Sequence, residues 1–341
     1  MTANKKILVT GGAGFIGSHT VLALIEAGYL PIVIDNFSNS HSWIAMELEN
    51  LAGQGIPVYE VDCTDEKKLA AVFDEEGPFE GVIHFAALKA VGESIEQPLK
   101  YYKNNLESLI RLLEQMERTD TKNLVFSSSC TVYGLPSIIP ITEDEEIKVP
   151  QSPYSATKII GEQIIRDVVI HGGKINGVLL RYFNPIGAHP SGKIGELPMG
   201  VPNNLVPYVS QTAAGWRDTI IINGNDYDTP DGTCIRDYIH VVDLAEAHVK
   251  ALSWLSKGKS LDVFNLGTGK GSSVEEVISL FEEVSEKTII RVIGPRRKGD
   301  VPAIWANADK AKTELGWEAK YSLKEALHHA WLWQENLNKK K

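Results

Sequence analysis

The chain has 341 residues, 43% of them hydrophobic, and it carries a formal net charge of −10 at pH 7. This composition is ordinary for a folded globular protein with one large or two moderate domains. The acidic balance argues against general nucleic-acid binding and against docking on an anionic membrane surface. No run of about eighteen apolar residues occurs, so no membrane-spanning helix is predicted.

The three cysteines, Cys63, Cys130 and Cys234, lie far apart and form no CxxC motif. An odd and sparse set of cysteines indicates reduced thiols in a cytoplasm, and not a disulfide framework or a zinc site. The apolar run at residues 7–9 turns directly into glycines and is too short for a signal peptide. We therefore expect a cytoplasmic protein without a metal.

The first motif is a strand, a glycine loop and a helix. Residues 6–10 (KILVT) predict a buried strand of a parallel sheet, and residues 18–28 predict a helix that stops at Gly28. Such a unit lets backbone N–H groups approach a pyrophosphate at a helix N-terminus. The spacing is G-x-x-G-x-x-G, so it departs from the general G-x-G-x-x-G fingerprint. The predicted cofactor contacts of this loop are Gly11, Gly14, Phe15, Ile16 and Gly17.

The next two strands end in acidic residues. Residues 31–34 predict a strand that runs into Asp35 and Asn36, and Asp35 follows Gly17 by 18 residues. A carboxylate at this distance binds the 2′-hydroxyl of an adenosine ribose and repels a 2′-phosphate, so NAD is favoured over NADP. Residues 56–61 predict a third strand that is followed by Asp62 and Cys63. Asp62 is a candidate partner for the adenine amino group, although both aspartates also suit turns or helix caps.

A fourth strand is predicted at residues 81–85, and the small residues Ala86 and Ala87 after Phe85 would let a cofactor pass closely. Lys89 lies just beyond and could reach a phosphate, although a lone lysine is more often exposed to solvent. A long helix predicted over residues 96–118 carries Asn104, a candidate partner of the nicotinamide ribose.

The fifth predicted strand, residues 122–126, runs into the segment SSSCTVYG, which contains Ser129. A helix predicted to begin at Ser152 and Pro153 places Tyr154 and Lys158 one turn apart on the same face. A neighbouring ammonium favours the phenolate, so Tyr154 would exchange a proton with a substrate hydroxyl that Ser129 holds. Lys158 would also bind the nicotinamide ribose. Taken alone, Tyr154 and Lys158 are also compatible with an exposed pair on a surface helix, and the serine segment is also compatible with a simple turn.

The second half is less regular. After Arg181 the sequence becomes rich in proline, glycine and asparagine as far as about residue 204, which is typical of binding loops. Arg236 and Arg297 together suit a diphosphate, although each alone would more often form a surface ion pair. Candidate polar contacts to a sugar nucleotide are Asn184, Asn204 and Asp300. Residues 241–255 predict an amphipathic helix that returns to the first domain, and residues 264–269 are interpreted as a structural turn.

The glycine loop, FAA at Phe85, SSSCTVYG and Tyr-x-x-x-Lys together resemble the extended short-chain dehydrogenase/reductase superfamily. Within it the chain resembles the UDP-glucose 4-epimerase family. The resemblance covers about residues 5–335, and its most specific segments are residues 181–192, 200–205, 224–227, 231–233, 236–244 and 295–300.

This resemblance implies a Rossmann-like, doubly wound parallel sheet with a smaller mixed α/β substrate domain. Residues 1–181, with 238–262 returning, would bind NAD, while 182–237 and 263–341 would bind the nucleotide sugar. The implied reaction converts UDP-galactose to UDP-glucose through a transient 4-keto sugar, with Tyr154 as the base. The resemblance adds Tyr182 and Phe183 to the cofactor contacts, and Leu205, Tyr238 and Ile304 to the substrate contacts. It also implies a homodimer, and Ile304 in place of a tyrosine suggests room for N-acetylated UDP-hexoses.

Two alternatives stay open at this level. One is an NDP-sugar 4,6-dehydratase, which usually needs an Asp-Glu pair after the serine of the fifth strand. Cys130, Thr131 and Val132 occupy that place, and none of them is a carboxylate. The other is a catalytically silent NAD-binding regulator, against which the intact Ser129, Tyr154 and Lys158 argue.

Overall fold

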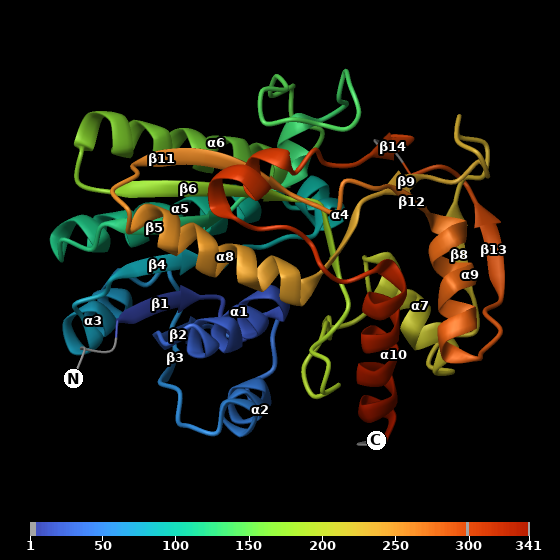
Figure 1. Cartoon of the computed structure of the whole chain (residues 1–341), viewed down its shortest axis with the longest axis horizontal. Helices are drawn as coiled ribbons and strands as arrows, with labels where there is room; N and C mark the ends of the chain where they lie inside the picture. The colour runs from blue at the N-terminus through green and yellow to red at the C-terminus, as the bar shows by residue number, and fades with distance from the viewer. Residues whose placement is uncertain (1–4, 298–299, 340–341) are drawn as a thin grey trace.

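The structure is a computed structural model that describes residues 5–297 and 300–339. Its centre is a seven-stranded parallel sheet in the order β11-β6-β5-β4-β1-β2-β3 (Figure 1). The strands of this sheet are β1 (Lys6–Thr10), β2 (Leu30–Asp35), β3 (Val58–Glu60), β4 (Gly81–His84), β5 (Asn123–Ser127), β6 (Asn176–Tyr182) and β11 (Leu261–Leu266).

The inner strands are largely apolar on both sides, as both faces of the sheet are covered. In β1, Ile7 and Val9 pack into the core on one face, and Leu8 packs into the core on the other. The same alternation holds in β5, where Val125 faces the first core and Phe126 the second. A strand buried on both faces has a continuous apolar sequence, which is the pattern that the short β-branched runs predicted.

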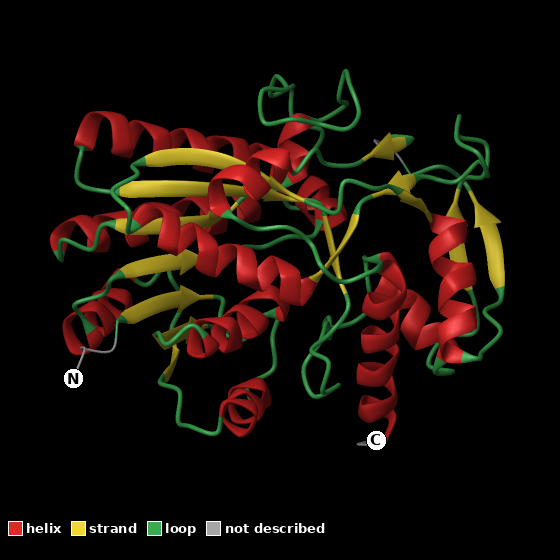
Figure 2. Cartoon of the chain, viewed as in Figure 1, coloured by secondary structure: helices red, strands yellow, loops and turns green. Residues whose placement is uncertain are grey.

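Helices form a layer on each face (Figure 2). The first core contains residues of α1 (Phe15–Glu26), α2 (Trp43–Ala52) and α8 (Val241–Leu255). The second contains residues of α3 (Glu66–Glu76), α5 (Pro98–Arg118) and α6 (Pro153–Asp167). The remaining helical segments of this part are α4 (Val91–Glu96), the 3-10 turn Cys130–Tyr133 and a π-helical turn, Val168–Gly172.

The rest of the chain packs beside the carboxyl ends of the sheet, around a separate core that includes Val209, Phe281 and Trp331 (Figure 1). Its helices are α7 (Leu205–Ala213), α9 (Val274–Ser285) and α10 (Leu323–Lys339). Three small sheets accompany them: β7 (Asn184–Ile186) with β10 (Tyr238–His240); β8 (Ile220–Asn223) with β13 (Arg291–Gly294); and β9 (Ile235–Arg236) between β12 (Ser272–Ser273) and β14 (Ala303–Ile304).

The predicted elements are mostly confirmed, with shifts at their ends. β1 and α8 have the predicted bounds, whereas α1 begins at Phe15 and not at residue 18, because the helix starts inside the glycine loop. Near the C-terminus, a π-helical turn, Ala311–Leu315, precedes α10.

The predicted domain boundary at residue 262 needs correction. It divides β11, which pairs with β6 up to Leu266 and is therefore part of the large sheet. The π-helical turn at residues 311–315 and Trp317 also pack into the first core of that sheet. In the described part of the chain, no helix has the length and apolar character that crossing a membrane requires.

Candidate functional site

The main cavity of the described residues has a volume of about 520 Å³ and follows the carboxyl ends of the parallel strands. Every predicted cofactor residue lines it, from Gly11 in the first loop to Phe183 after β6. Since ligands of open parallel sheets bind at this edge, the cavity is the expected place for a dinucleotide.

The glycine loop has the shape that a phosphate cradle requires. Gly11 has a φ of +70°, and a Cβ on Gly17 would lie 2.2 Å from the Gly11 carbonyl oxygen. A Cβ on Gly12 would lie 2.8 Å from the Cγ1 atom of Val33. Any side chain at these positions would force apart the loop, α1 and β2. The loop thus delivers bare backbone to the cavity at the N-terminus of α1, which fits a pyrophosphate.

The acidic ends of β2 and β3 are held by local hydrogen bonds. Asp35 accepts from the backbone N–H groups of Ala13 (3.0 Å) and Phe37 (2.9 Å) and from the Ser40 hydroxyl (2.8 Å). Asp62 accepts from Thr64 and, through its other oxygen, from the Asn36 amide at 2.9 Å. The carboxylate of Asp35 therefore joins the glycine loop to the end of β2, with both aspartates facing the cavity.

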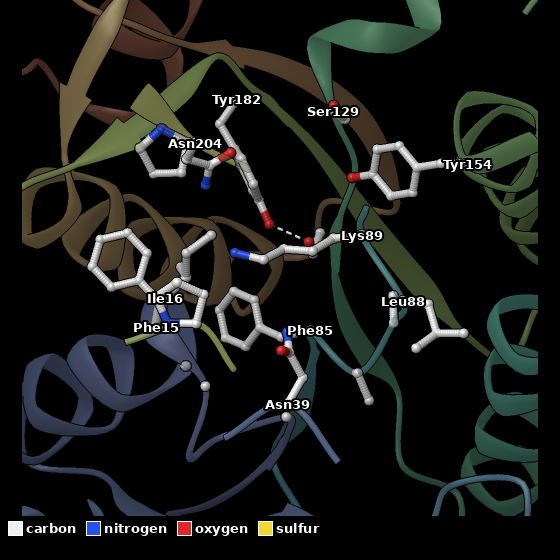
Figure 3. Close-up of a pocket in the computed structure, with 18 of the residues that line it drawn as sticks. Phe15, Ile16, Asn39, Phe85, Leu88, Lys89, Ser129, Tyr154, Tyr182 and Asn204 are labelled. Carbon is white, nitrogen blue, oxygen red and sulfur yellow. Dashed lines mark hydrogen bonds between the residues drawn. The ribbon is translucent and has the colours of Figure 1, made fainter. Parts of the chain in front are cut away.

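Across the cavity, Glu196 joins the two parts of the chain. Its Oε1 atom accepts hydrogen bonds from Lys89 Nζ (3.2 Å) and from Asn204 Nδ2 (2.7 Å). Lys89 follows β4, and Asn204 precedes α7, so the carboxylate links a predicted cofactor residue to a predicted substrate residue. Figure 3 shows Lys89 extending across the pocket beside Phe85.

Ser129, Tyr154 and Lys158 meet at the end of β5. The N-terminus of α6 is capped as predicted: Pro153 is in its first turn, and the Ser152 hydroxyl accepts from the Ser155 N–H. In Figure 3 the hydroxyl groups of Tyr154 and Tyr182 both point toward the middle of the pocket. The Tyr182 hydroxyl is hydrogen-bonded to Ser127 Oγ. The hydroxyl groups of Ser127, Ser129, Tyr154 and Tyr182 thus line the same part of the chain's main cavity.

Burial dominates the electrostatics of this cluster. Burial raises the pKa of Tyr154 to about 12, an effect that a hydrogen bond with Ser129 opposes. Burial also lowers the pKa of Lys158 to about 8, against the attraction of Glu162. The Lys158 ammonium donates to the Ser127 carbonyl oxygen at 2.5 Å and lies 5.9 Å from the centre of the Tyr154 ring. Burial therefore favours the neutral phenol and opposes the ionised form that Lys158 is predicted to favour.

Most predicted substrate residues also line the main cavity, namely Asn184, Asn204, Arg236, Arg297, Asp300 and Ile304. Arg236 donates to Asp300 at 3.3 Å and to the Val301 carbonyl at 2.8 Å, so β9 fixes its guanidinium group. Ile304 lies opposite Arg236 in the β9–β14 pair and is 6% exposed. Leu205 and Tyr238 do not line this cavity.

They line a second cavity of about 320 Å³ in the smaller part of the chain. Asn184, Pro185, Asn204, Arg236, Arg297 and Asp300 border both cavities, so the two are neighbours with the arginine pair between them. The second cavity is also lined by apolar residues of α7, β8 and α9, including Val206, Ile222 and Val274, and by the polar residues Asn203, Asn223 and Thr233. A ligand with a flat ring and a diphosphate would place the diphosphate at the arginines.

Sequence reasoning missed several lining residues. The segment from Ser38 to His41 borders the main cavity after β2, and its small polar residues directly after Asp35 were the available signal. Glu196 also lines it, with no local motif to mark it. The three cysteines are buried free thiols, and among residues 5–297 and 300–339 no cluster of histidine, cysteine and acidic side chains could hold a metal ion.

Comparisons with known proteins identify the relatives of this site. A family model described as the NAD dependent epimerase/dehydratase family matches residues 7–267. A UDP-glucose 4-epimerase of Dictyostelium discoideum is 51% identical over 332 residues, which cover 97% of this chain and 96% of that protein. The human UDP-glucose 4-epimerase is 49% identical over 337 residues, or 97% of both chains.

Among solved structures, the UDP-glucose 4-epimerase from Bifidobacterium longum in complex with NAD+ and UDP has a TM-score of 0.94 and 46% identity. The alignment covers 97% of this chain and 98% of that one. These relatives are epimerases, so the comparisons favour neither the dehydratase nor the silent regulator. The chain belongs to the NAD-dependent epimerase/dehydratase family and, within it, to the UDP-glucose 4-epimerases.

Proposed function

We propose that this chain interconverts UDP-galactose and UDP-glucose at the C4 position through a transient 4-keto sugar, with Tyr154 exchanging the O4 proton. The observation that carries this assignment is the convergence of Ser129, Tyr154 and Lys158 on the dinucleotide cavity, beside the arginine pair of the second cavity. An alcohol that loses a hydride must also lose its hydroxyl proton, and a buried phenol at the cofactor edge suits that transfer.

The cofactor is NAD, and the glycine loop fits its pyrophosphate. In this proposal Asp35, Asn36, Asp62 and Cys63 surround the adenosine, while Phe85, Ala86, Ala87 and Asn104 flank the middle of the cofactor. Lys158, Tyr182 and Phe183 lie toward the nicotinamide end. When bound, NAD supplies the hydride acceptor and donor together with a positive charge on its ring.

Within the protein, Tyr154 holds the proton that leaves O4 and returns it when the C4 configuration has changed. Ser129 accepts hydrogen bonds from Thr131 at its Oγ atom, so its own hydroxyl hydrogen is available for the sugar oxygen or for Tyr154. Because burial raises the pKa of Tyr154 to about 12, additional positive charge must help it release its proton at neutral pH. The Lys158 ammonium, on the same helical face, provides part of that charge.

We expect Tyr154→Phe to lower kcat by about 10²- to 10⁴-fold, since the phenolate form of Tyr154 is the proton acceptor. The Kd of UDP should stay within about twofold, because the ring and the cavity are retained. Tyr29→Phe, a partly buried tyrosine outside the cavity, is the matched control. Turnover of UDP-galactose by Tyr154→Phe at close to the parent rate would refute the assignment.

The sugar must rotate to present its other face between the two hydride transfers, so the diphosphate has to stay anchored. We assign that anchor to Arg236 and Arg297, with Asn184, Asn204 and Asp300 binding the sugar or the ribose. Leu205 and Tyr238, which line the second cavity, would contact the nucleoside. The part of the chain that contains the large sheet, residues 1–181 with 238–266, would then bind NAD. The remaining part, residues 182–237 with 267–341, would bind the nucleotide sugar.

Arg297→Ala should raise the KM for UDP-galactose by about ten- to hundredfold, the effect of losing a hydrogen bond to a charged group. Its neighbour Arg296 offers a matched control, because Arg296 pairs with Asp226 at 2.7 Å and lies over the Tyr227 ring, outside both cavities. Equal KM values for Arg297→Ala and Arg296→Ala would remove Arg297 from the diphosphate site.

The side chain at residue 304 sets the room beside the sugar. Ile304 lines the cavity next to Cys130 and Phe183, and a tyrosine there would extend into the space. We propose that this chain also accepts UDP-GlcNAc and UDP-GalNAc. In Ile304→Tyr, turnover of UDP-GlcNAc relative to UDP-galactose should fall at least about tenfold, and an unchanged ratio would contradict the idea.

We further propose a homodimer that pairs through α5 and α6. Ile110 on α5 and Ile160 on α6 are 42% and 37% exposed, although these helices pack side by side. Light scattering should give the mass of two chains, and Ile110→Lys should shift it toward one chain because a charge would be buried. Ile290→Lys, at an exposed position on the smaller part, is the control. A parent protein of single-chain mass would end this proposal.

A cytoplasmic location is likewise a proposal, supported by the three free thiols. Fractionation of cells that express a tagged chain would decide it.

A further inference from the structure

The serine turn after β5 is held from behind by a buried ion pair. Glu162 lies on α6 one turn after Lys158, and Arg181 lies on β6. Arg181 donates to Glu162 through Nε (2.8 Å) and Nη2 (2.5 Å), and their side chains are only 2% and 1% exposed. Neither residue lines the cavity, so neither is placed to contact a ligand.

The pair reaches the site through Ser128, which is completely buried. The Ser128 hydroxyl donates to Glu162 Oε1 at 2.5 Å, and its backbone N–H donates to the Leu180 carbonyl at 2.9 Å. On one side of Ser128, the Ser127 carbonyl accepts from Lys158 Nζ. On the other side is Ser129, the proposed partner of the sugar oxygen. Two successive turns of α6 thus hold two consecutive serines, Ser127 and Ser128, directly before Ser129.

The far side of the pair is equally fixed. Arg181 Nη1 donates to the Tyr133 hydroxyl at 3.1 Å, and that hydroxyl donates to Asn265 Oδ1 at 2.6 Å. Asn265, at the end of β11, donates its backbone N–H to Glu143 at 2.7 Å. The network therefore connects β11, β6 and the helical turn after Ser129 to α6. The Glu162 carboxylate accepts two hydrogen bonds from Arg181 and one from Ser128, so it has little freedom to move.

We infer that Glu162 is a positioning residue for the reaction: it orients the serine turn through Ser128 and keeps Lys158 in its charged form. The first role follows from the hydrogen bonds, and the second from the place of a negative charge one helical turn beyond a buried ammonium. The inference rests on the proposed roles of Ser129, Tyr154 and Lys158.

The charge effect has a definite sign. Burial lowers the pKa of Lys158 to about 8, and Glu162 acts in the opposite direction. Removing the carboxylate should therefore lower that pKa further, so the amine loses its proton, and the enzyme its activity, at a lower pH. The titratable and charged groups that contact or act on Lys158 are Tyr154 and Glu162 on α6 and His84 on β4, whereas Arg181 and Tyr182 on β6 are connected to it only through Glu162 and Ser127. Burial lowers the pKa of His84 to about 3, so His84 stays neutral over this range.

Ser128→Ala tests the orienting role without changing any charge. We expect kcat to fall by about ten- to hundredfold, the range for small displacements of reacting groups, while the KM for UDP-galactose stays within about twofold. Ser285→Ala is the matched control, because Ser285 is also buried with a single hydrogen bond, to the Phe281 carbonyl at 2.7 Å, on distant α9. The control should keep the parent kcat.

The charge role needs the double variant Glu162→Gln/Arg181→Met, since Glu162→Gln alone would leave a buried cation unpaired and threaten folding. The glutamine can still accept from Ser128, so the serine turn keeps its hydrogen bond. We expect the alkaline fall of kcat to move to lower pH by about one unit. Asp167→Asn removes an exposed carboxylate from the same helix and should leave the pH profile unchanged.

Circular dichroism and the bound NAD content must first show that each variant is folded. The inference is overturned if folded Ser128→Ala keeps the parent kcat, or if the folded double variant keeps the parent alkaline limb. It is also overturned if activity falls only in proportion to the folded fraction. Tyr154→Phe distinguishes failure of the proposed function from failure of the positioning role. If Tyr154→Phe is active, the proposed function is refuted. If Tyr154→Phe is inactive while Ser128→Ala and the double variant behave like the parent, only the positioning role is refuted.

Discussion

The parallel pairing of the central strands is the constraint on which the site depends. Because all seven strands run in the same direction, the loops after β1, β2, β4, β5 and β6 emerge at one edge. Gly11, Asp35, Phe85, Ser129 and Tyr182 are spread over more than half the chain, yet they line one cavity. A shift of a single strand by one residue would exchange its two faces and remove its contribution to the site.

Burial sets the chemistry of the proton-handling residues. It disfavours both charged forms, so it raises the pKa of Tyr154 and lowers that of Lys158. Burial thus favours the neutral phenol of Tyr154, and Glu162 opposes the loss of charge from Lys158. The buried ions in this region are paired, because Glu162 and Arg181 form two hydrogen bonds with each other. Removing one partner of such a buried pair typically destabilises the folded state by about 3–5 kcal/mol.

The smaller part of the chain contributes the second cavity and the arginine pair, which a dinucleotide-binding fold does not itself provide. Its strand β9 fixes Arg236 between Asp300 and Val301, and β14 places Ile304 opposite. Glu196 then connects Asn204 to Lys89 across the cavity. In our proposal the sugar nucleotide is anchored by the smaller part, while the reacting carbon lies against Ser129 and Tyr154 of the larger part. Such a separation would let the sugar turn without release, because the anchor and the reacting groups belong to different cores.

Local sequence determined the strands, the glycine loop, the Ser152 and Pro153 start of α6 and the spacing of Tyr154 and Lys158, because each follows from short-range sterics and periodicity. Family resemblance added Tyr182, Phe183, Leu205, Tyr238 and Ile304 to the candidate site. Only the tertiary structure placed β11 in the large sheet, and only it separated Leu205 and Tyr238 into a second cavity. It also revealed Glu196 between the two parts and Glu162 behind the serine turn. Contacts between distant segments, and the burial that shifts a pKa, arise only when the chain has packed, so no local pattern could carry them.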